Sequence, residues 1–427
     1  MQKSSENNMK SEVVVTGMGV YTSIGNHIDN FEKALRQGKC GIRYEDSNPL
    51  LPETLKLQAK ITYVFSEEVK KWEAVVPDIC ATAKKNLRRA SKVVQLSALA
   101  SMEAWVQAGL YETQVPKDKL SIIVAGSNLN QSACFAQAQK YMKEPEYVSP
   151  SYALQFMDTD LVGNLSELFG IQEDGFTIGG ASASGNVAII KAYQFLMRSD
   201  LDACMVVAPI AELSKVELMS FHNLNVLGGK TLGENSCRPF DKKHEGFVPA
   251  EGCGCIILEK KESALRRNAT IYAQLLSGAI SLDGNRLSNP SLEGESNTMK
   301  KALEIADIDG KEIGYINAHA TSTPMGDEIE VAAIKKVFDK NLKHIWVNST
   351  KSLTGHCLYS AGLIELIATI LEMRGGFVHP NLNLEEPIDT ELNLVGNMAR
   401  EVQFDYAMSN SFGFGGINTC VIIKRGK

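Results

Sequence analysis

The chain has 427 residues, 44% of them hydrophobic and 22% charged, with a net charge of −6. This length and composition predict a large buried core divided into two or more subdomains. The acidic balance, with no dense basic tract, argues against a nucleic-acid-binding protein. No apolar run approaches the roughly 20 residues that span a bilayer, so we expect no membrane span.

The start of the chain and its cysteines indicate a cellular setting. Residues 1–10 are polar and lack the apolar segment of a signal peptide, so we expect a disordered tail, with Met9 as an alternative start. The nine cysteines are scattered without paired spacing. This pattern is typical of a reducing compartment, and we expect a cytoplasmic protein.

In the first half of the chain, apolar runs bounded by glycine alternate with helical stretches. We predict strands over 11–19, 122–126, 203–208 and 252–258. The segment 176–186 is a run of small residues followed by an apolar helix that starts near Val187. Such a turn presents one side chain at a helix N-terminus, and Ser182 occupies that position.

The second half repeats this plan. We predict strands over 313–319, 345–348, 402–408 and 420–423, and an apolar helix over 362–373. Strands that alternate with helices favour a mostly parallel sheet covered on both faces. The two halves, 11–260 and 261–427, meet near residues 259–267.

Five separated motifs resemble those of the β-ketoacyl-acyl-carrier-protein synthase family, from about residue 11 to the end of the chain. They lie at 13–20, 238–252, 317–327, 348–356 and 410–418. The resemblance implies an α/β thiolase-like fold with duplicated αβαβα halves and mixed, largely parallel sheets. It also implies a homodimer, with the turn at Ser182 in the N-terminal half and both catalytic histidines in the C-terminal half.

The resemblance implies roles for individual residues. His319 and His356 match the two catalytic histidines, and Lys351 matches the lysine. Glu365 matches the helix glutamate, and Phe414 matches the gatekeeper phenylalanine. Two further matches, Thr321 and Thr323, correspond to threonines that hold the amides of a phosphopantetheine arm.

The chemistry of malonyl decarboxylation explains why such groups are needed. Loss of CO2 from a malonyl thioester leaves an enolate, whose oxyanion needs donors fixed in advance. Two neutral imidazole N–H groups supply them, and loss of one such donor costs on the order of 100- to 1,000-fold in rate. Lys351 and Glu365 are expected to fix the charge and tautomers of the histidines. Phe414 is expected to form a low-dielectric wall beside the departing carboxylate.

Ser182 stands where the family has a cysteine nucleophile. A cysteine forms a thiolate readily at a helix N-terminus, whereas a serine hydroxyl needs an adjacent general base. The turn offers no such base, so acyl transfer is impaired while decarboxylation is not. The chain therefore resembles the ketosynthase-like decarboxylases with serine at this position, found beside HMG-CoA-synthase-like enzymes in polyketide β-branching cassettes. The implied reaction converts malonyl-acyl-carrier protein to acetyl-acyl-carrier protein.

Two other functions remain open. Chain-length-factor subunits also lack the cysteine and act as non-catalytic partners of a ketosynthase, and a serine-dependent condensing enzyme or acyltransferase is a third possibility. Three segments, 125–131, 179–181 and 357–360, depart from the family pattern. A blocked or shortened acyl tunnel would fit a decarboxylase, which needs no growing chain. We interpret Cys253 and Cys255 as core residues, and reject Cys357 as a nucleophile. The other five histidines are interpreted as structural: His27, His222, His244, His344 and His379.

A basic segment is a candidate docking surface for an acidic carrier protein. Its residues recur at a spacing of three to four, which predicts one face of a helix: Lys84, Lys85, Arg88, Arg89 and Lys92. The alternative is a solvated helix surface. We expect no metal and no cofactor of the protein's own, because the phosphopantetheine arm arrives with the carrier protein. A polyketide synthase and the HMG-CoA-synthase-like enzyme are the expected pathway partners.

Overall fold

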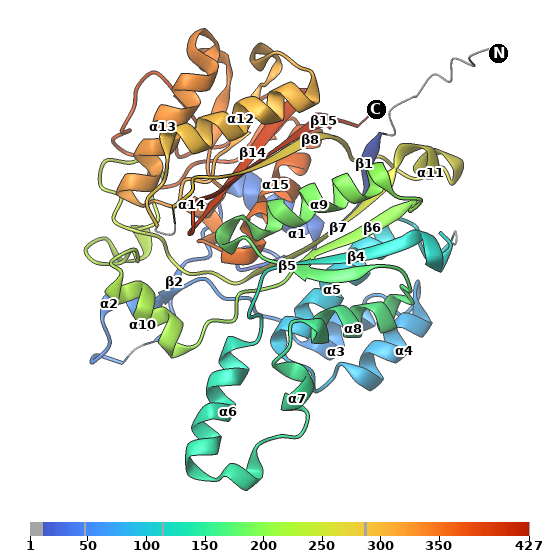
Figure 1. Cartoon of the computed structure of the whole chain (residues 1–427). Coiled ribbons are helices and arrows are strands. Elements are labelled where there is room, and N and C mark those ends of the chain that lie inside the picture. The colour runs from blue at the N-terminus through green and yellow to red at the C-terminus, as the bar shows by residue number, and fades with distance from the viewer. Residues whose placement is uncertain (1–11, 47, 113–114, 286–287, 427) are drawn as a thin grey trace, which may run out of the picture.

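One mixed sheet runs through the molecule (Figure 1), in the strand order β12-β10-β9-β14-β15-β8-β1-β7-β6-β4-β5. The computed structural model describes residues 12–46, 48–112, 115–285 and 288–426. The tail expected over residues 1–10 lies outside these ranges. Within them, no helix combines the length and apolar character needed to cross a membrane.

The two halves of the sheet follow the same pairing plan. The N-terminal half contributes β1 (Val13–Thr22), β4 (Leu120–Ala125), β5 (Gly175–Ile178), β6 (Ala203–Ala208) and β7 (Gly252–Lys260). The C-terminal half contributes β8 (Ala273–Leu282), β9 (Tyr315–Asn317), β10 (Trp346–Asn348), β12 (Asn393–Leu394), β14 (Tyr406–Gly413) and β15 (Ile417–Arg425). In each half the outer strands pair in parallel and the inner strands antiparallel, and β1 joins β8 in the middle.

The expected α/β class is confirmed, although antiparallel pairing is more frequent than the sequence pattern indicates. The chain returns from β14 directly into the antiparallel β15 without a crossover helix. The turn between them contains Gly415 and Gly416, both with positive φ. A tight glycine turn is enough to connect two neighbouring antiparallel strands, whereas two parallel strands need a longer crossover connection.

Helices form layers outside and between the two halves of the sheet (Figure 1). The central helices α9 (Ser184–Arg198) and α15 (Ala361–Gly375) contact strands of both halves. One outer face is covered by α5 (Lys92–Gln107) and α8 (Thr159–Phe169), and the other by α12 (Leu292–Ala306) with α13 (Pro324–Phe338) beside it. This helix–sheet–helix–sheet–helix stack is the layered arrangement expected for the thiolase-like fold.

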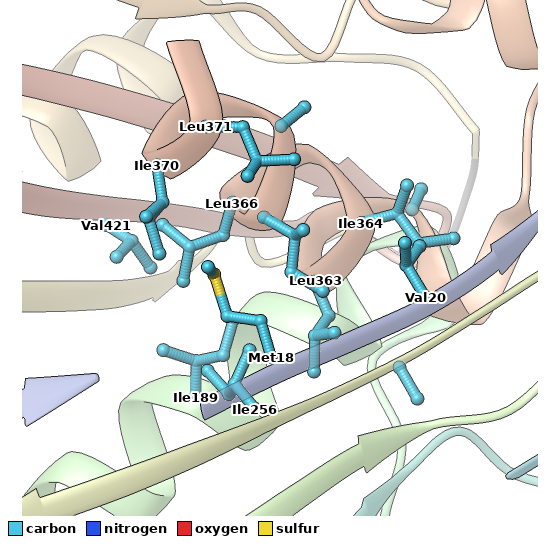
Figure 2. Packing of buried hydrophobic residues seen from close by; sticks show 14 of the residues in the cluster. Met18, Val20, Ile189, Ile256, Leu363, Ile364, Leu366, Ile370, Leu371 and Val421 are labelled. Carbon is cyan, nitrogen blue, oxygen red and sulfur yellow. The ribbon is translucent and has the colours of Figure 1, made fainter. Parts of the chain in front are cut away.

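The central layer is the hydrophobic centre of the molecule. Figure 2 shows Leu363, Ile364 and Leu366 of α15 packed near Met18 and Val20 of β1. Every residue of α15 from Ala361 to Met373 is buried, and most of them are apolar. A helix of this kind is stable only when it is enclosed by other elements. The segments that precede α9 and α15, which carry Ser182 and His356, are therefore held on a rigid base.

Further helices and strands complete the fold. They are α1 (Ile28–Gln37), β2 (Arg43–Tyr44), α2 (Glu53–Lys56), β3 (Leu57–Gln58), α3 (Phe65–Lys70), α4 (Pro77–Asn86), α6 (Gln131–Lys143), α7 (Tyr152–Gln155), α10 (Lys215–Asn223), α11 (Lys261–Arg266), α14 (Lys351–Thr354), β11 (Phe377–Val378) and β13 (Arg400–Glu401). Helices α6 and α7 form an arm that projects from the body of the molecule in Figure 1.

The basic segment does not form one helical face, so that prediction is wrong. Helix α4 ends at Asn86, and α5 begins only at Lys92. Leu87 is buried in the turn between them, and the Ser91 side chain caps α5 by accepting from the Val94 N–H at 3.4 Å. This cap starts a new helix, which leaves Arg88 and Arg89 on the turn.

The strand expected over 402–408 begins later than predicted. Residues 400–401 form β13, which pairs with β11 in a separate two-stranded sheet, and β14 begins at Tyr406. The Val402 N–H donates to the Gly376 carbonyl, so this part of the chain remains beside β11. Val402 and Phe404 thus precede β14 and belong to neither strand.

Gly185 permits the close crossing of α9 and α15. A Cβ at this position would lie 2.6 Å from the backbone nitrogen of Leu363. We expect Gly185→Ala to lower the melting temperature, because overpacking costs about 1–3 kcal/mol. Gly163→Ala in α8 is the matched control, since a Cβ there meets nothing within 4 Å. The control should raise stability by about 0.5–1 kcal/mol through helix propensity. Equal melting temperatures for the two variants would contradict this account.

Candidate active site

Ser182 is presented by a tight turn between β5 and α9. Ala181 has φ 48°, in the left-handed region that non-glycine residues rarely adopt. The Ser184 hydroxyl accepts from the Gly180 N–H at 2.9 Å and donates to the Ala181 carbonyl at 2.7 Å. These bonds hold the strained turn in place. The expected placement of Ser182 at the entrance to a helix is confirmed.

Two carboxylates of α13 hold the loop that carries His319. Asp327 accepts from the Ser322 N–H at 3.0 Å, and Glu330 accepts from the His319 and Ala320 N–H groups at 2.9 and 2.7 Å. Burial raises the pKa of Glu330 to about 7. Glu330 is not among the site residues predicted from the sequence. Its position three residues after Asp327, on the same helical face, is the signal that was available.

The tautomer of His356 is set by the backbone of the next turn. The Leu358 N–H donates to His356 Nδ1 at 3.3 Å, so in the neutral ring the proton is on Nε2. Nε2 lies 2.9 Å from Ser182 Oγ. In this pair the imidazole therefore donates and the serine oxygen accepts. A general base for Ser182 would need the opposite direction.

Lys351 and Glu365 form a buried ion pair next to His319. Lys351 Nζ lies 2.5 Å from Glu365 Oε1 and 3.3 Å from His319 Nδ1. Burial raises the pKa of Glu365, and the Lys351 charge opposes this shift. An ammonium group has only donors, so His319 Nδ1 accepts and its proton is also on Nε2. Lys351 thus fixes the tautomer of His319, whereas a backbone amide does so for His356.

The two imidazoles lie together and are neutral. Their ring centroids are 5.6 Å apart, with the planes at 81°. Burial lowers the pKa of both rings, and the charge of Lys351 lowers it further. Two neutral rings with Nε2–H groups are the arrangement that a developing oxyanion requires.

His319, His356 and Ser182 line one cavity of about 550 Å3. Phe414 and the pair Thr321 and Thr323 also line it, and the two threonine hydroxyls share a hydrogen bond of 2.9 Å. Phe414 is 41% exposed, whereas the ring of Phe412 lies 5.7 Å from that of His319. Phe412 thus lies on the histidine pair, as does Phe247, whose ring is 5.1 Å from that of His356.

The remaining candidates lie away from the cavity. All seven histidines are described, and only His319 and His356 line it. Cys253 and Cys255 are fully buried on β7, and burial raises the pKa of Cys357 to about 12. Two of the basic residues are already paired, Lys84 with Glu73 and Lys92 with Glu251 at 2.6 Å. Arg88 and Arg89 are exposed.

The tautomers and charges of the two histidines can be measured. In protein labelled with 15N-histidine, we expect His319 and His356 to stay neutral with the proton on Nε2 from about pH 8 to about pH 5.5, a range that spans the usual histidine pKa of about 6.5. The control is the urea-unfolded protein, in which both rings should protonate near that value. Protonation of His356 near pH 6.5 in the folded protein would contradict the assignment.

Comparisons with known proteins identify the family of this chain. The model of the beta-ketoacyl synthase N-terminal domain matches residues 10–264, and that of the C-terminal domain matches residues 272–385. The chain is 37% identical to the polyketide biosynthesis malonyl-ACP decarboxylase PksF of Bacillus subtilis over 97% of this chain and 96% of that protein. It is 32% identical to 3-oxoacyl-[acyl-carrier-protein] synthase 2 of Staphylococcus aureus, over 97% and 98% of the two chains.

The fold also matches solved structures. One is the complex AntDE:AntF, a type II polyketide synthase acyl-carrier protein with its ketosynthase bound to the hexaketide, at TM-score 0.86 and 25% identity. The match covers 98% of this chain and 100% of that chain. With both domain models matched, the fold shared and the histidine pair in place, this chain belongs to the beta-ketoacyl synthase family of enzymes.

Proposed function

We propose that this protein decarboxylates malonyl-acyl-carrier protein to acetyl-acyl-carrier protein without acylating Ser182. The observation that carries the proposal is the direction of the Ser182–His356 hydrogen bond. His356 Nδ1 accepts from the Leu358 N–H, so Nε2 donates to the serine. The hydroxyl is therefore not deprotonated, and the same Nε2–H is available to an oxyanion.

The proposed reaction proceeds in two steps. The bond between the malonyl carboxylate and the α-carbon breaks, CO2 leaves, and the electron pair moves into the thioester carbonyl. The resulting enolate oxygen accepts from the Nε2–H groups of His319 and His356. The α-carbon then takes a proton from solvent and becomes the methyl group of an acetyl thioester. The thioester bond to the carrier remains intact throughout.

The apolar wall of the cavity favours the first step. Phe412 packs against His319, and Phe247 lies 5.1 Å from His356 with its ring at 89°. A carboxylate next to such rings is poorly hydrated, and its loss as neutral CO2 relieves that cost. We assign Phe414 to the same wall and to control of the cavity mouth, in line with its exposed position.

The relatives support the choice of substrate. PksF is named as a malonyl-ACP decarboxylase of polyketide biosynthesis, and the AntDE:AntF structure holds a ketosynthase with its acyl-carrier protein. We extend both properties to this chain, with Thr321 and Thr323 bonding to the amides of the phosphopantetheine arm. We also propose a cytoplasmic homodimer that acts in β-branching, beside an HMG-CoA-synthase-like enzyme and a polyketide synthase.

The alternative of a non-catalytic partner subunit has less support. A subunit of that kind has no need for a neutral histidine pair or for a buried ion pair beside it. Here all four groups are present: His319, His356, Lys351 and Glu365, with Lys351 only 1% exposed. Burying an ion pair costs desolvation free energy, so the presence of this pair favours a functional role for it.

The decisive assay mixes the purified protein alone with malonyl-loaded carrier protein and follows the mass of the carrier. We expect conversion to the acetyl carrier. Replacement of either catalytic histidine by alanine should reduce CO2 release on the order of 100- to 1,000-fold, because each removes one oxyanion donor. Ser182→Ala should cost less than either change. His222→Ala is the control, since His222 bonds to Thr54 outside the cavity and should leave the rate unchanged.

Each failure has a distinct meaning. An unchanged carrier in the absence of an added ketosynthase would refute the decarboxylase and favour the partner subunit. Protein acylated at Ser182 would favour the acyltransferase or condensing enzyme. Loss of decarboxylation in Ser182→Ala would show that the hydroxyl takes part in the reaction.

Carrier docking gives a separate prediction. We assign it to Arg88 and Arg89, with Lys84, Lys85 and Lys92 nearby, because an acidic carrier needs a local basic surface. Reversal of the two arginine charges by Arg88→Glu with Arg89→Glu should raise KM for the carrier, and the effect should shrink as added salt screens the charges. The control is Lys300→Glu with Lys301→Glu on α12, which makes the same net change in the other half of the molecule. Equal KM values for the two double variants would exclude this surface.

A further inference from the structure

Tyr359 lines the cavity that contains Ser182 and His356, here called the chamber. It belongs to the single-turn helix η7 (Leu358–Ser360), which follows His356 directly. This turn packs against the single-turn helix that carries Ser182, η3 (Ala181–Ala183). Tyr359 lines the same cavity as Ser182 and His356, and its side chain is only partly buried. One side of the residue therefore faces the chamber.

The other side of Tyr359 packs against the hydrophobic cluster of the N-terminal half. That cluster contains Leu129, Leu161 and Ile210, none of which is among the residues that line the cavity. The fit depends on Gly126, which has φ 115°. A Cβ there would lie 3.3 Å from both Cβ and Cδ2 of Tyr359. The tyrosine thus occupies the space between the chamber and the apolar cluster behind it.

The backbone of the same turn fixes the direction of the tyrosine. Leu358 has φ 51°, a conformation that a leucine rarely adopts. This conformation accompanies the bond from the Leu358 N–H to His356 Nδ1. The Leu358 side chain is 7% exposed and packs in a cluster with Leu227 and Phe247. One strained turn therefore both orients the histidine and places residue 359 against the cavity.

We propose that Tyr359 is a specificity-determining residue that closes the chamber beside Ser182, so that it admits acyl groups of only a few carbons. The inference rests on the proposed function, because it limits which acyl carriers the decarboxylase accepts. An acyl chain that runs from residue 182 toward this apolar cluster would have to pass Tyr359, which lines the cavity and packs against the cluster. Without the ring, the chain would reach the apolar surface of Leu129 and its neighbours.

A trapping experiment tests this steric role without relying on decarboxylation. Ser182→Cys supplies a nucleophile at the turn, and intact mass then shows which acyl group is transferred from acetyl- or octanoyl-pantetheine thioesters. We expect acetylation and little octanoylation. The double variant Ser182→Cys with Tyr359→Gly should gain octanoylation about ten-fold or more, because each methylene buried in the opened space is favourable. Acetylation should change little.

Two controls complete the design. Tyr359→Phe in the Ser182→Cys protein keeps the ring and should still exclude the octanoyl group. The parent protein with Ser182, treated in parallel, reports any labelling of the native cysteines. Octanoylation of Ser182→Cys as fast as acetylation would overturn the proposal. So would a Tyr359→Gly double variant that takes acetyl but not octanoyl.

A binding measurement covers the case in which no acyl group is transferred. Calorimetry with acetyl- and octanoyl-pantetheine amides should show that the protein with Tyr359 binds the octanoyl amide no more tightly than the acetyl amide. In Tyr359→Gly the octanoyl amide should bind about ten-fold tighter or more, for the same reason. Equal behaviour of the two proteins would refute the role of Tyr359. Failure of the decarboxylase assay alone would refute the proposed function and leave this result standing.

Discussion

The active site depends on a lysine held inside the protein by a single carboxylate. Lys351 is 1% exposed and pairs with Glu365 of the buried helix α15 at 2.5 Å. Removing one member of such a pair leaves an uncompensated buried charge, at a cost of about 3–5 kcal/mol. The charge of this buried pair acts on the neighbouring histidines. The ammonium group bonds to His319 and, through its charge, lowers the pKa of both imidazoles. Burial is the larger cause of their neutral state, and this one cation reinforces it.

Two separate hydrogen bonds set the tautomers of His319 and His356, and these tautomers determine which reactions the site supports. Lys351 acts on His319, and the Leu358 amide acts on His356. Both rings then point an N–H into the cavity, so neither accepts a proton from Ser182. A cysteine at residue 182 would present a thiolate to these donors. A serine hydroxyl presents no anion, so in the proposed reaction the donors act on the enolate oxygen alone.

Much of this arrangement was predictable from the sequence, because it depends on local patterns. The strands at 203–208 and 345–348, the turn at Ser182 and the grouping of both histidines with Lys351 all followed from motifs. The rest depends on backbone conformation and long-range packing. The Leu358 amide has no side chain to mark it, and Glu330 lies just beyond the motif. The basic segment has helical spacing throughout, and only the buried Leu87 with the Ser91 cap divides it into two helices.

The continuous sheet has a consequence for how the enzyme is made. Ser182 lies in the N-terminal half and His356 in the C-terminal half, 174 positions apart, yet they share a hydrogen bond. The halves join where β1 pairs with β8, and β8 is completed on its other edge by β15, the last strand of the chain. During synthesis the N-terminal half leaves the ribosome first, with the inner edge of its sheet still unpaired. A nascent chain therefore completes this sheet, and with it the base of its catalytic centre, only after β15 has been synthesised.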